Sequence, residues 1–351
     1  MKQPAKLKDV AERAGVSPAA ISRFLNGSLL LPEATVSRIE AAIAHFDYRP
    51  NPHARRLSLG RSDTIALVLP EIGNPFFAEL AAAAEEAASE QGLGVMLFAT
   101  GNRRARELEY LARLGSSDVD ALLFVTNLTD DDGALASAIG RAARVVLLDE
   151  DVPGTSVTKV FCDNEAGGRL AARAFLEAGH RRLVYIGGPR DLMSSRERGA
   201  GFRAAAREAG LAEAAVTEFY GDYSLAHGRA TAEALLADGA PPTAIFASSD
   251  QVLLGLLPVF RAHGVRVPAD VSLVTFDDVA PLDFFDPPIS AIRQSISDMG
   301  RTGVERLVAL IRGENTPAEI LRLPIEFVAR ASVAPPRGDG KFQENSTWRP
   351  R

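Results

Sequence analysis

The sequence lacks the residues and segments that several classes of protein need. Its 351 residues include one cysteine, Cys162, which excludes an intrachain disulfide and fits a reducing compartment. No apolar run approaches the ~18 residues that a membrane span needs, and the N-terminus lacks the apolar core of a signal peptide. We therefore expect a cytoplasmic protein with no membrane contact.

The motifs of common enzyme classes are also missing. The five histidines are scattered and form no metal-spaced set with the cysteine. Gly199-Ala200-Gly201 continues into Phe202-Arg203-Ala204, which lacks the third glycine of a dinucleotide fingerprint. No nucleophile elbow follows a predicted strand. We expect no enzyme activity, and hence no catalytic residues, metal or cofactor.

The charge is acidic overall but unevenly distributed. The net charge of −6, taken alone, argues against a nucleic-acid partner. Residues 1–62, however, hold ten Lys/Arg and five Asp/Glu, so this segment carries +5 and the remainder −11. A basic head on an acidic body favours a polyanionic partner for the head only. The length predicts two to three domains.

Residues 7–26 predict two short helices joined by a tight turn. Gly15 breaks the first helix, because glycine enters the left-handed conformation cheaply. Ser17 is placed to cap the second helix, and Pro18 fits its first position, where a missing N–H costs nothing. Apolar residues at helical spacing give the buried sides of both helices: Val10, Ala11, Ala14, Ile21, Phe24 and Leu25.

The second helix presents a small and polar outer face, made of Ala19, Ala20, Ser22, Arg23 and Asn26. Such a pair of helices is typical of a helix-turn-helix, although an ordinary helical hairpin with solvated charges has the same pattern. A third helix from about Glu33 to Phe46 would close a three-helix core. In the following linker, Asn51 and Pro52 permit a short helix, which would be unstable unless something holds it; a plain tether is the alternative.

Beyond Ser62, short apolar runs alternate with helical stretches of a dozen or more residues. Strands that are apolar throughout, each followed by a helix, indicate parallel sheets covered on both faces. Their number favours two similar α/β halves with a cleft between them. The predicted strands are Thr64–Leu69, Val95–Phe98, Ala121–Val125, Val145–Leu148, Leu183–Ile186, Val216–Phe219, Ala244–Ala247 and Val271–Phe276.

An ordered series of motifs over residues 6–334 resembles the lactose-repressor/galactose-repressor (LacI/GalR) family of bacterial transcription regulators. It starts with the helix-turn-helix, the junction at 48–51 and the hinge at 54–57. Each piece is weak alone, but the order is highly specific. The motifs of the body are Asn74-Pro75-Phe76-Phe77, Asp163-Asn164, Glu177-Ala178-Gly179-His180, Gly187-Gly188-Pro189, Arg196-Glu197-Arg198, Gly201-Phe202, Ser249-Asp250-Gln251, Val267–Ser272 and Phe276-Asp277-Asp278.

This resemblance implies an α/β fold in three parts. An N-terminal three-helix helix-turn-helix domain would hold residues 1–49, and a hinge helix and linker 50–61. The effector-binding core, 62–334, would resemble periplasmic binding proteins, with two doubly wound α/β subdomains connected by three strands. The first subdomain would hold 62–162 and 291–322, and the second 163–290 and 323–334. Composition predicts a disordered tail at 335–351.

The resemblance also implies a sequence-specific regulator, a repressor by expectation, that binds a pseudo-palindromic double-stranded operator as a homodimer. The second helix would lie in the major groove, where Arg23 could bind a guanine edge. Leu57 matches a leucine that paired hinge helices push between base pairs, with burial against the core as the alternative. The candidate DNA-binding residues are Ser17, Ala19, Ser22, Arg23, Asn26, Asn51, Ala54, Arg55 and Leu57.

The resemblance finally implies a small effector between the subdomains, a monosaccharide or sugar acid by expectation, or a purine. Arg196 and Asp250 match the effector-contacting positions best. Phe77 could equally be core, and Asp149 and Asp163 could be helix caps. An effector that prefers one closure state would change DNA affinity by linkage. The candidate effector residues are Phe76, Phe77, Thr126, Asp149, Asp163, Arg196, Tyr223, Asp250 and Gln294; Asp277 and Asp278 are left out as possible turn formers.

Overall fold

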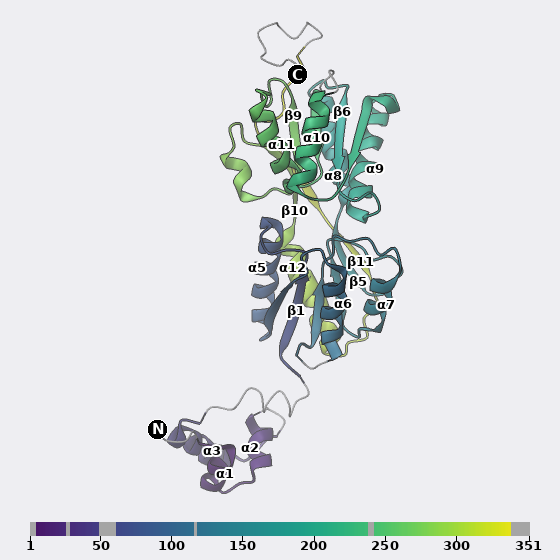
Figure 1. The fold of residues 1–351 in the computed structure, drawn as a ribbon. Helices are drawn as coiled ribbons and strands as arrows, with labels where there is room; N and C mark the ends of the chain where they lie inside the picture. Colours follow the sequence, from purple (N-terminus) through teal and green to yellow (C-terminus); the bar gives the residue numbers. More distant parts are fainter. Residues whose placement is uncertain (1–4, 26–28, 49–60, 116–117, 238–241, 338–351) are drawn as a thin grey trace. The chain divides into compact units, whose positions relative to one another are not determined.

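The structure is a computed structural model that describes residues 5–25, 29–48, 61–115, 118–237 and 242–337 (Figure 1). The chain divides into two compact units, residues 1–63 and residues 64–351. The first unit is helical and the second is α/β, which confirms the predicted fold class. Among the described residues, no helix has the length and apolarity that crossing a membrane requires.

The described residues of the first unit form a bundle of three helices, with the predicted helix-turn-helix at its start. Gly15 ends the first helix at a φ of 68°, in the left-handed region where a side chain would be strained. The Ser17 hydroxyl oxygen accepts a hydrogen bond from the Ala20 amide at 3.1 Å, which caps the second helix as predicted. Val10, Ile21 and Ile39 form the centre of the core. The helices are α1 (Leu7–Ala14), α2 (Pro18–Leu25) and α3 (Glu33–Phe46).

The second unit contains two six-stranded sheets, and each sheet with its helices forms a lobe. The first sheet has the order β11-β5-β4-β3-β1-β2 and is parallel throughout. Its strands are β1 (Thr64–Leu69), β2 (Gly94–Ala99), β3 (Ala121–Phe124), β4 (Val145–Leu148), β5 (Thr158–Cys162) and β11 (Ile320–Leu323). Its helices are α5 (Pro75–Glu90), α6 (Arg104–Ala112), η1 (Arg113–Gly115), α7 (Ala134–Arg141) and α12 (Ile296–Ile311).

The second sheet has the order β12-β10-β9-β8-β6-β7, and only the edge strand β12 is antiparallel to its neighbour. Its strands are β6 (Leu183–Gly187), β7 (Val216–Tyr220), β8 (Ala244–Ala247), β9 (Ser272–Phe276), β10 (Ser290–Gln294) and β12 (Ile325–Val328). Its helices are α8 (Asn164–Glu177), α9 (Met193–Glu208), η2 (Glu213–Ala215), α10 (Leu225–Ala237), α11 (Asp250–Ala262) and η3 (Ala280–Phe284).

The inner strands of both sheets are buried on both faces, as their largely apolar sequences predict. In β1, Ile65 and Leu67 pack toward α5 and α12, while Ala66 and Val68 pack toward α6 and α7. Residues of β8 alternate in the same way: one set packs toward α8 and α9, and the other packs toward α10 and α11. The resulting layers place the carboxyl ends of the parallel strands at one edge of each lobe.

The chain passes between the lobes three times: from β5 to α8, from β10 to α12 and from β11 to β12. The predicted subdomain boundaries need correction at two of these points. Residues 291–294 pair with β9 and β12 and therefore lie in the second sheet, because the chain leaves that sheet only after Gln294. Leu323 pairs with Cys162 and lies in the first sheet.

All eight predicted strands are present, and among the described residues four more occur: β5, β10, β11 and β12. Residues 49–60 of the predicted junction and hinge lie outside the described residues, as do 338–351 of the predicted tail. The first residues of that tail are described, and Arg337 forms an ion pair with Asp270 at 2.9 Å.

Candidate functional site

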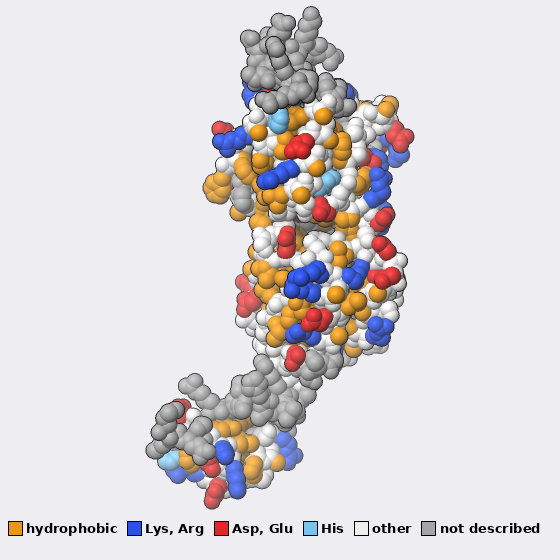
Figure 2. All heavy atoms as spheres, in the orientation of Figure 1, with side chains coloured by type: hydrophobic (Ala, Val, Ile, Leu, Met, Phe, Trp, Pro, Cys, Tyr) orange, Lys and Arg blue, Asp and Glu red, His pale blue; other side chains and the backbone are white. Residues whose placement is uncertain are grey.

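The outer face of α2 is small and accessible, as a helix that enters a DNA groove requires. Ala19 and Arg23 are exposed, and Ser22 is half-buried. Lys and Arg side chains lie on the visible face of this unit (Figure 2). The other candidate DNA-binding residues, Asn26, Asn51, Ala54, Arg55 and Leu57, lie outside the described residues.

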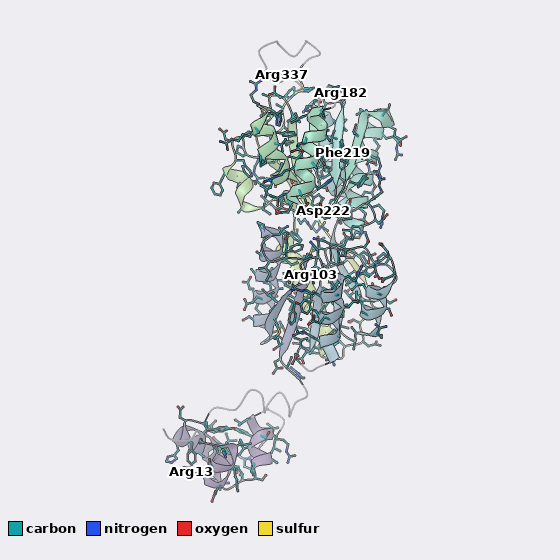
Figure 3. All side chains as sticks on the ribbon, viewed as in Figure 1. Arg13, Arg103, Arg182, Phe219, Asp222 and Arg337 are labelled. Carbon is teal, nitrogen blue, oxygen red and sulfur yellow. The ribbon has the colours of Figure 1, made fainter. Side chains whose placement is uncertain are left out.

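In the second unit, polar side chains gather where strands of both sheets end. Asp149 follows β4, Asp277 follows β9, and Gln294 ends β10. Asp149 and Asp277 have φ angles of 66° and 71°, a left-handed conformation that non-glycine residues adopt mostly at special sites. Asp222, which follows β7, lies at the edge of the second lobe that faces the first (Figure 3). The carboxyl ends of both sheets therefore supply one site, named here the Arg198 cluster: Asp149, Glu150, Asn164, Ser194, Arg198, Tyr223, Ser248, Asp250, Phe276, Asp277 and Gln294.

Arg198, on α9, is the centre of this cluster and is 3% exposed. Its Nε donates to the Asn164 side-chain oxygen at 2.7 Å, and its Nη1 donates to the Ser248 carbonyl oxygen at 2.7 Å. The guanidinium lies 3.5 Å from the centroid of the Phe276 ring, a cation–π contact. Burial alone would lower the pKa of this group, but nearby acidic groups raise it, so Arg198 stays charged.

Two glycines allow α9 to approach α8 closely enough for this geometry. A Cβ on Gly168 would lie 2.0 Å from the Arg198 carbonyl oxygen, and a Cβ on Gly201 would lie 2.0 Å from the Glu165 carbonyl oxygen. Any larger residue at either position would force the helices apart. The close approach brings Asn164, the first residue of α8, against Arg198.

The carboxyl groups around Arg198 are held in a medium that disfavours their charge. Burial raises the pKa of Asp149 to about 7, opposed by Arg198 and reinforced by Asp277 and Glu150. Burial and the charge of Asp277 also raise the pKa of Asp250 to about 7. Burial raises the pKa of Asp277 as well, although Arg198 and Gln294 oppose this. Shifts of this kind are typical of functional sites, because buried charged groups are costly without a partner.

Glu150 joins the two lobes across the cluster. Its carboxylate accepts hydrogen bonds from the amides of Met193 and Ser194, at the start of α9, at 2.8 and 3.1 Å. The Ser194 hydroxyl donates to the same carboxylate at 2.6 Å and lies 3.0 Å from the Tyr223 hydroxyl. A helix N-terminus stabilises such a carboxylate. Arg322 adds a second link between lobes, with two hydrogen bonds to Glu197 at 2.6 and 2.7 Å.

Five buried polar atoms of the cluster have no hydrogen-bond partner among the described residues. They are Asp149 Oδ1, Asn164 Nδ2, Ser248 Oγ, Asp250 Oδ1 and Gln294 Oε1. Buried polar atoms in proteins are nearly always hydrogen-bonded, so a convergent set of orphans indicates a place where a polar ligand binds. Within the described parts of the chain, no group of three or more His, Cys, Asp or Glu side chains is placed to hold a metal ion.

Four of the nine candidate effector residues come together in this cluster: Asp149, Tyr223, Asp250 and Gln294. Arg196 does not join them, because it is exposed and donates to the Asp191 carbonyl oxygen at 3.2 Å. Arg198, two residues further along α9, instead occupies the position in the cluster that was predicted for Arg196. Helical spacing could have found this residue, since Ser194, Arg198 and Phe202 share the buried face of α9.

The remaining candidates have structural contacts. Phe76 and Phe77 pack edge to face, at 5.1 Å between ring centroids, inside the main core. The Thr126 hydroxyl donates to Glu107 at 2.6 Å. Asp163 caps α8 by accepting from the Ala166 amide at 3.0 Å, which is the alternative stated for it above.

A groove of about 610 Å³ lies elsewhere, between α6 and α7 of the first lobe. Leucine and alanine side chains form most of its lining, and Asp120, Arg141 and Arg144 also line it. It shares no residue with the Arg198 cluster and has no comparable convergence of polar atoms. We therefore place the candidate effector site at the cluster.

Family models match both units of this chain. Residues 6–51 match the model described as "Bacterial regulatory proteins, lacI family", and residues 172–333 match the model of a periplasmic binding protein-like domain. Among curated proteins, the chain is 32% identical to the HTH-type transcriptional regulator DegA of Bacillus subtilis, over 93% of this chain and 97% of that protein. It is 35% identical to the regulator CelR of Thermobifida fusca, again over 93% and 97%.

Solved structures of bacterial regulators are similar to this chain over nearly its whole length. The CelR–cellobiose complex superposes with a TM-score of 0.71 at 33% identity, covering 94% of this chain and all of that one (100%). The lac repressor dimer bound to operator and the anti-inducer ONPF gives a TM-score of 0.80 at 28% identity, covering 95% and 100%. With its helix-turn-helix, its two-lobed α/β body and relatives matched over nearly their whole length, this chain belongs to the lacI family of bacterial regulatory proteins.

Proposed function

We propose that this protein is a transcriptional repressor of the bacterial cytoplasm whose affinity for its operator is set by a sugar-like effector bound at the Arg198 cluster. The five orphaned polar atoms carry the effector half of this proposal, because a convergent set of hydrogen-bonding groups without partners suits a polyhydroxyl ligand. The helix-turn-helix and the family relationship support the DNA half. Two solved relatives are a CelR complex with cellobiose and a lac repressor complex with the anti-inducer ONPF, which supports a sugar-like effector.

On DNA, α2 would lie in the major groove with Arg23 directed at base edges. Ser17, Ala19 and Ser22 would complete the contact surface, together with Asn26. Asn51, Ala54, Arg55 and Leu57 would contribute from the hinge, with Leu57 as a wedge in the minor groove. The basic excess of residues 1–62 would contribute the phosphate contacts.

The effector would act through the relation between the two lobes. Asp149 and Glu150 come from the first lobe, whereas Arg198, Asp250 and Gln294 come from the second. A ligand that touches both sets stabilises one degree of lobe closure over others and shifts that equilibrium by its differential affinity. In a dimer, closure would change the spacing of the two linkers and thereby the affinity for DNA.

A homodimer is part of the proposal, because two heads are needed to read a pseudo-palindrome. The edge strand β2 offers a surface for it, since Met96 is 39% exposed and Leu97 is 42% exposed. An open strand edge with exposed apolar residues favours association. The second lobe also has an exposed apolar side chain, that of Phe284, which is 88% exposed.

The test is operator selection followed by effector titration. The full-length protein is used to select binding sequences from a random duplex library, and the enriched site is titrated with sugars in a gel shift. We expect an enriched pseudo-palindrome whose affinity changes at least tenfold with one sugar. Failure to enrich any sequence refutes the DNA half. An enriched site that no sugar or purine affects refutes the effector half. Light scattering of Leu97→Glu against the unchanged chain tests the dimer.

A further inference from the structure

The Arg198 cluster offers mainly hydrogen-bond acceptors to a ligand. The orphaned oxygens of Asp149 and Asp250 accept when the carboxyl groups are ionised. The Gln294 amide Nε2 donates a hydrogen bond to Asp277 Oδ1 at 2.6 Å, so the orphaned Gln294 oxygen is also an acceptor. Only the Asn164 amide nitrogen is restricted to donating, while the Ser248 hydroxyl can do either. A ligand that satisfies this set must donate hydrogen bonds at several positions.

The cluster also carries more negative groups than positive ones. The cluster holds four carboxyl groups and a single guanidinium, that of Arg198. Asp149, Glu150 and Asp277 interact with Arg198, and Asp250 interacts with Asp277. Burial has already raised the pKa of Asp149 and Asp250 to about 7, so further negative charge would be repelled in a medium of low dielectric.

Part of the guanidinium fork of Arg198 is already committed within the protein. A guanidinium binds a carboxylate best through two parallel N–H donors. In Arg198, Nε is already bonded to Asn164 and Nη1 to the Ser248 carbonyl oxygen. Two of its five N–H groups are therefore in use within the protein. A carboxylate that approached the remaining N–H groups of Nη1 and Nη2 would have to enter among the surrounding carboxyl groups, which oppose it.

We propose that the effector is a neutral carbohydrate, recognised through its hydroxyl donors, and that the Arg198 cluster rejects sugars that carry a carboxylate. The sequence led us to expect a monosaccharide or a sugar acid as effector. This proposal keeps the neutral sugar and excludes the sugar acid. It rests on the proposed function, because it assumes that the cluster is the effector site.

The experiment compares matched pairs of sugars on the full-length protein by calorimetry at pH 7.5. Each neutral pentose, hexose or disaccharide is paired with its own uronic or aldonic acid, for example glucose with glucuronate and cellobiose with cellobionate. We expect at least one neutral sugar to bind, and its acid to bind at least tenfold more weakly. An acid that binds as well as its neutral partner overturns the inference while sugar sensing stands. A panel in which nothing binds overturns sugar sensing itself, and the inference with it; operator selection decides the DNA half separately.

Two variants then test the cause of the rejection. Asp250→Asn and Asp149→Asn each remove one carboxyl group with little change in shape. We expect the affinity ratio of acid to neutral sugar to rise at least threefold in either variant, whatever happens to the absolute affinity. Glu233→Gln, which removes an exposed charge from α10 of the same lobe, is the matched control and should leave the ratio unchanged. If no variant moves the ratio, or if all three move it equally, the local charge argument is wrong.

Discussion

Arg198 Nε donates to the side-chain oxygen of Asn164 at 2.7 Å, and this bond joins α9 to the residue that begins α8. Asn164 comes directly after the first passage between the lobes, next to Cys162 of β5. A buried guanidinium fixed in this way is both an anchor for the second lobe and the centre of the candidate effector site.

The first prediction separates Arg198 from Arg196. Arg198→Lys keeps the positive charge but loses the planar fork that serves Asn164 and the Ser248 carbonyl, so effector affinity should fall at least tenfold. Arg196→Lys, in an exposed side chain on the same helix, should leave effector affinity unchanged. Calorimetry with the effector found in the sugar panel measures both. The reverse pattern would return the effector role to Arg196 and remove the cluster as the site.

The second prediction concerns the close contact of α8 and α9. Gly168→Ala and Gly201→Ala would each place a methyl group 2.0 Å from a backbone oxygen, so each should lower the free energy of unfolding by about 1–3 kcal/mol or more. Gly140→Ala, in exposed α7 surface with open space around it, should be neutral or gain up to about 1 kcal/mol. Urea unfolding measures all three. Equal stability of all three variants would contradict the close approach.

The third prediction is a dependence of stability on pH. Asp149 and Asp250 have a pKa of about 7 in the folded chain, well above the usual range of an unfolded aspartate. Between about pH 4 and pH 7 the folded state binds more protons, so stability should fall as pH rises through this window, by roughly 1.4 kcal/mol per pH unit per group at most. This stability is fully present below about pH 4.

Asp250→Asn removes one of these groups and should therefore become more stable relative to the unchanged chain as pH rises from 5 to 8. Urea unfolding at each pH measures the difference. Glu233→Gln should give a difference that does not vary with pH in this way. A constant difference for Asp250→Asn would mean that its carboxyl group is ionised throughout the range.

The fourth prediction concerns DNA reading. Arg23→Ala should weaken binding to the selected operator by about 1–3 kcal/mol and relax preference at one base pair in each half-site. Arg38→Ala removes the same charge from exposed α3 and should weaken binding to all sequences alike, if at all. Effector affinity should not change in either variant. A gel shift over single-base operator variants tells the two effects apart.

The elements that could be predicted from the sequence are those whose local pattern and burial agree. Gly15 and Ser17 marked the turn and cap of the helix-turn-helix, and the eight fully or largely apolar runs marked strands. The missed strands β11 and β12 are short and half exposed, so they have no continuous apolar run. In β10, Arg293 interrupts the pattern because it pairs at the surface with Asp278 and Glu326.

The candidate site was harder, because long-range contacts decide it. Asp149, Tyr223, Asp250 and Gln294 were named from motif positions, and the structure brings them together. Motif position also suggested Arg196, whereas the phase of α9 selects Arg198. Ser248 and Glu150 carry no signal of their own, and Asn164 was noted only as part of the Asp163-Asn164 motif. Each becomes part of the site because strands of two lobes end at the same place.

The three passages between the lobes have a consequence for synthesis on the ribosome. The first lobe begins with β1, but its strand β11 and its helix α12, which packs against α5, are translated only after nearly all of the second lobe. The sheet of the first lobe therefore remains incomplete while the second lobe is synthesised and folds. We expect the first lobe to mature only after most of the second lobe has been made, and the first lobe to need a chaperone most before residue 324 has been added.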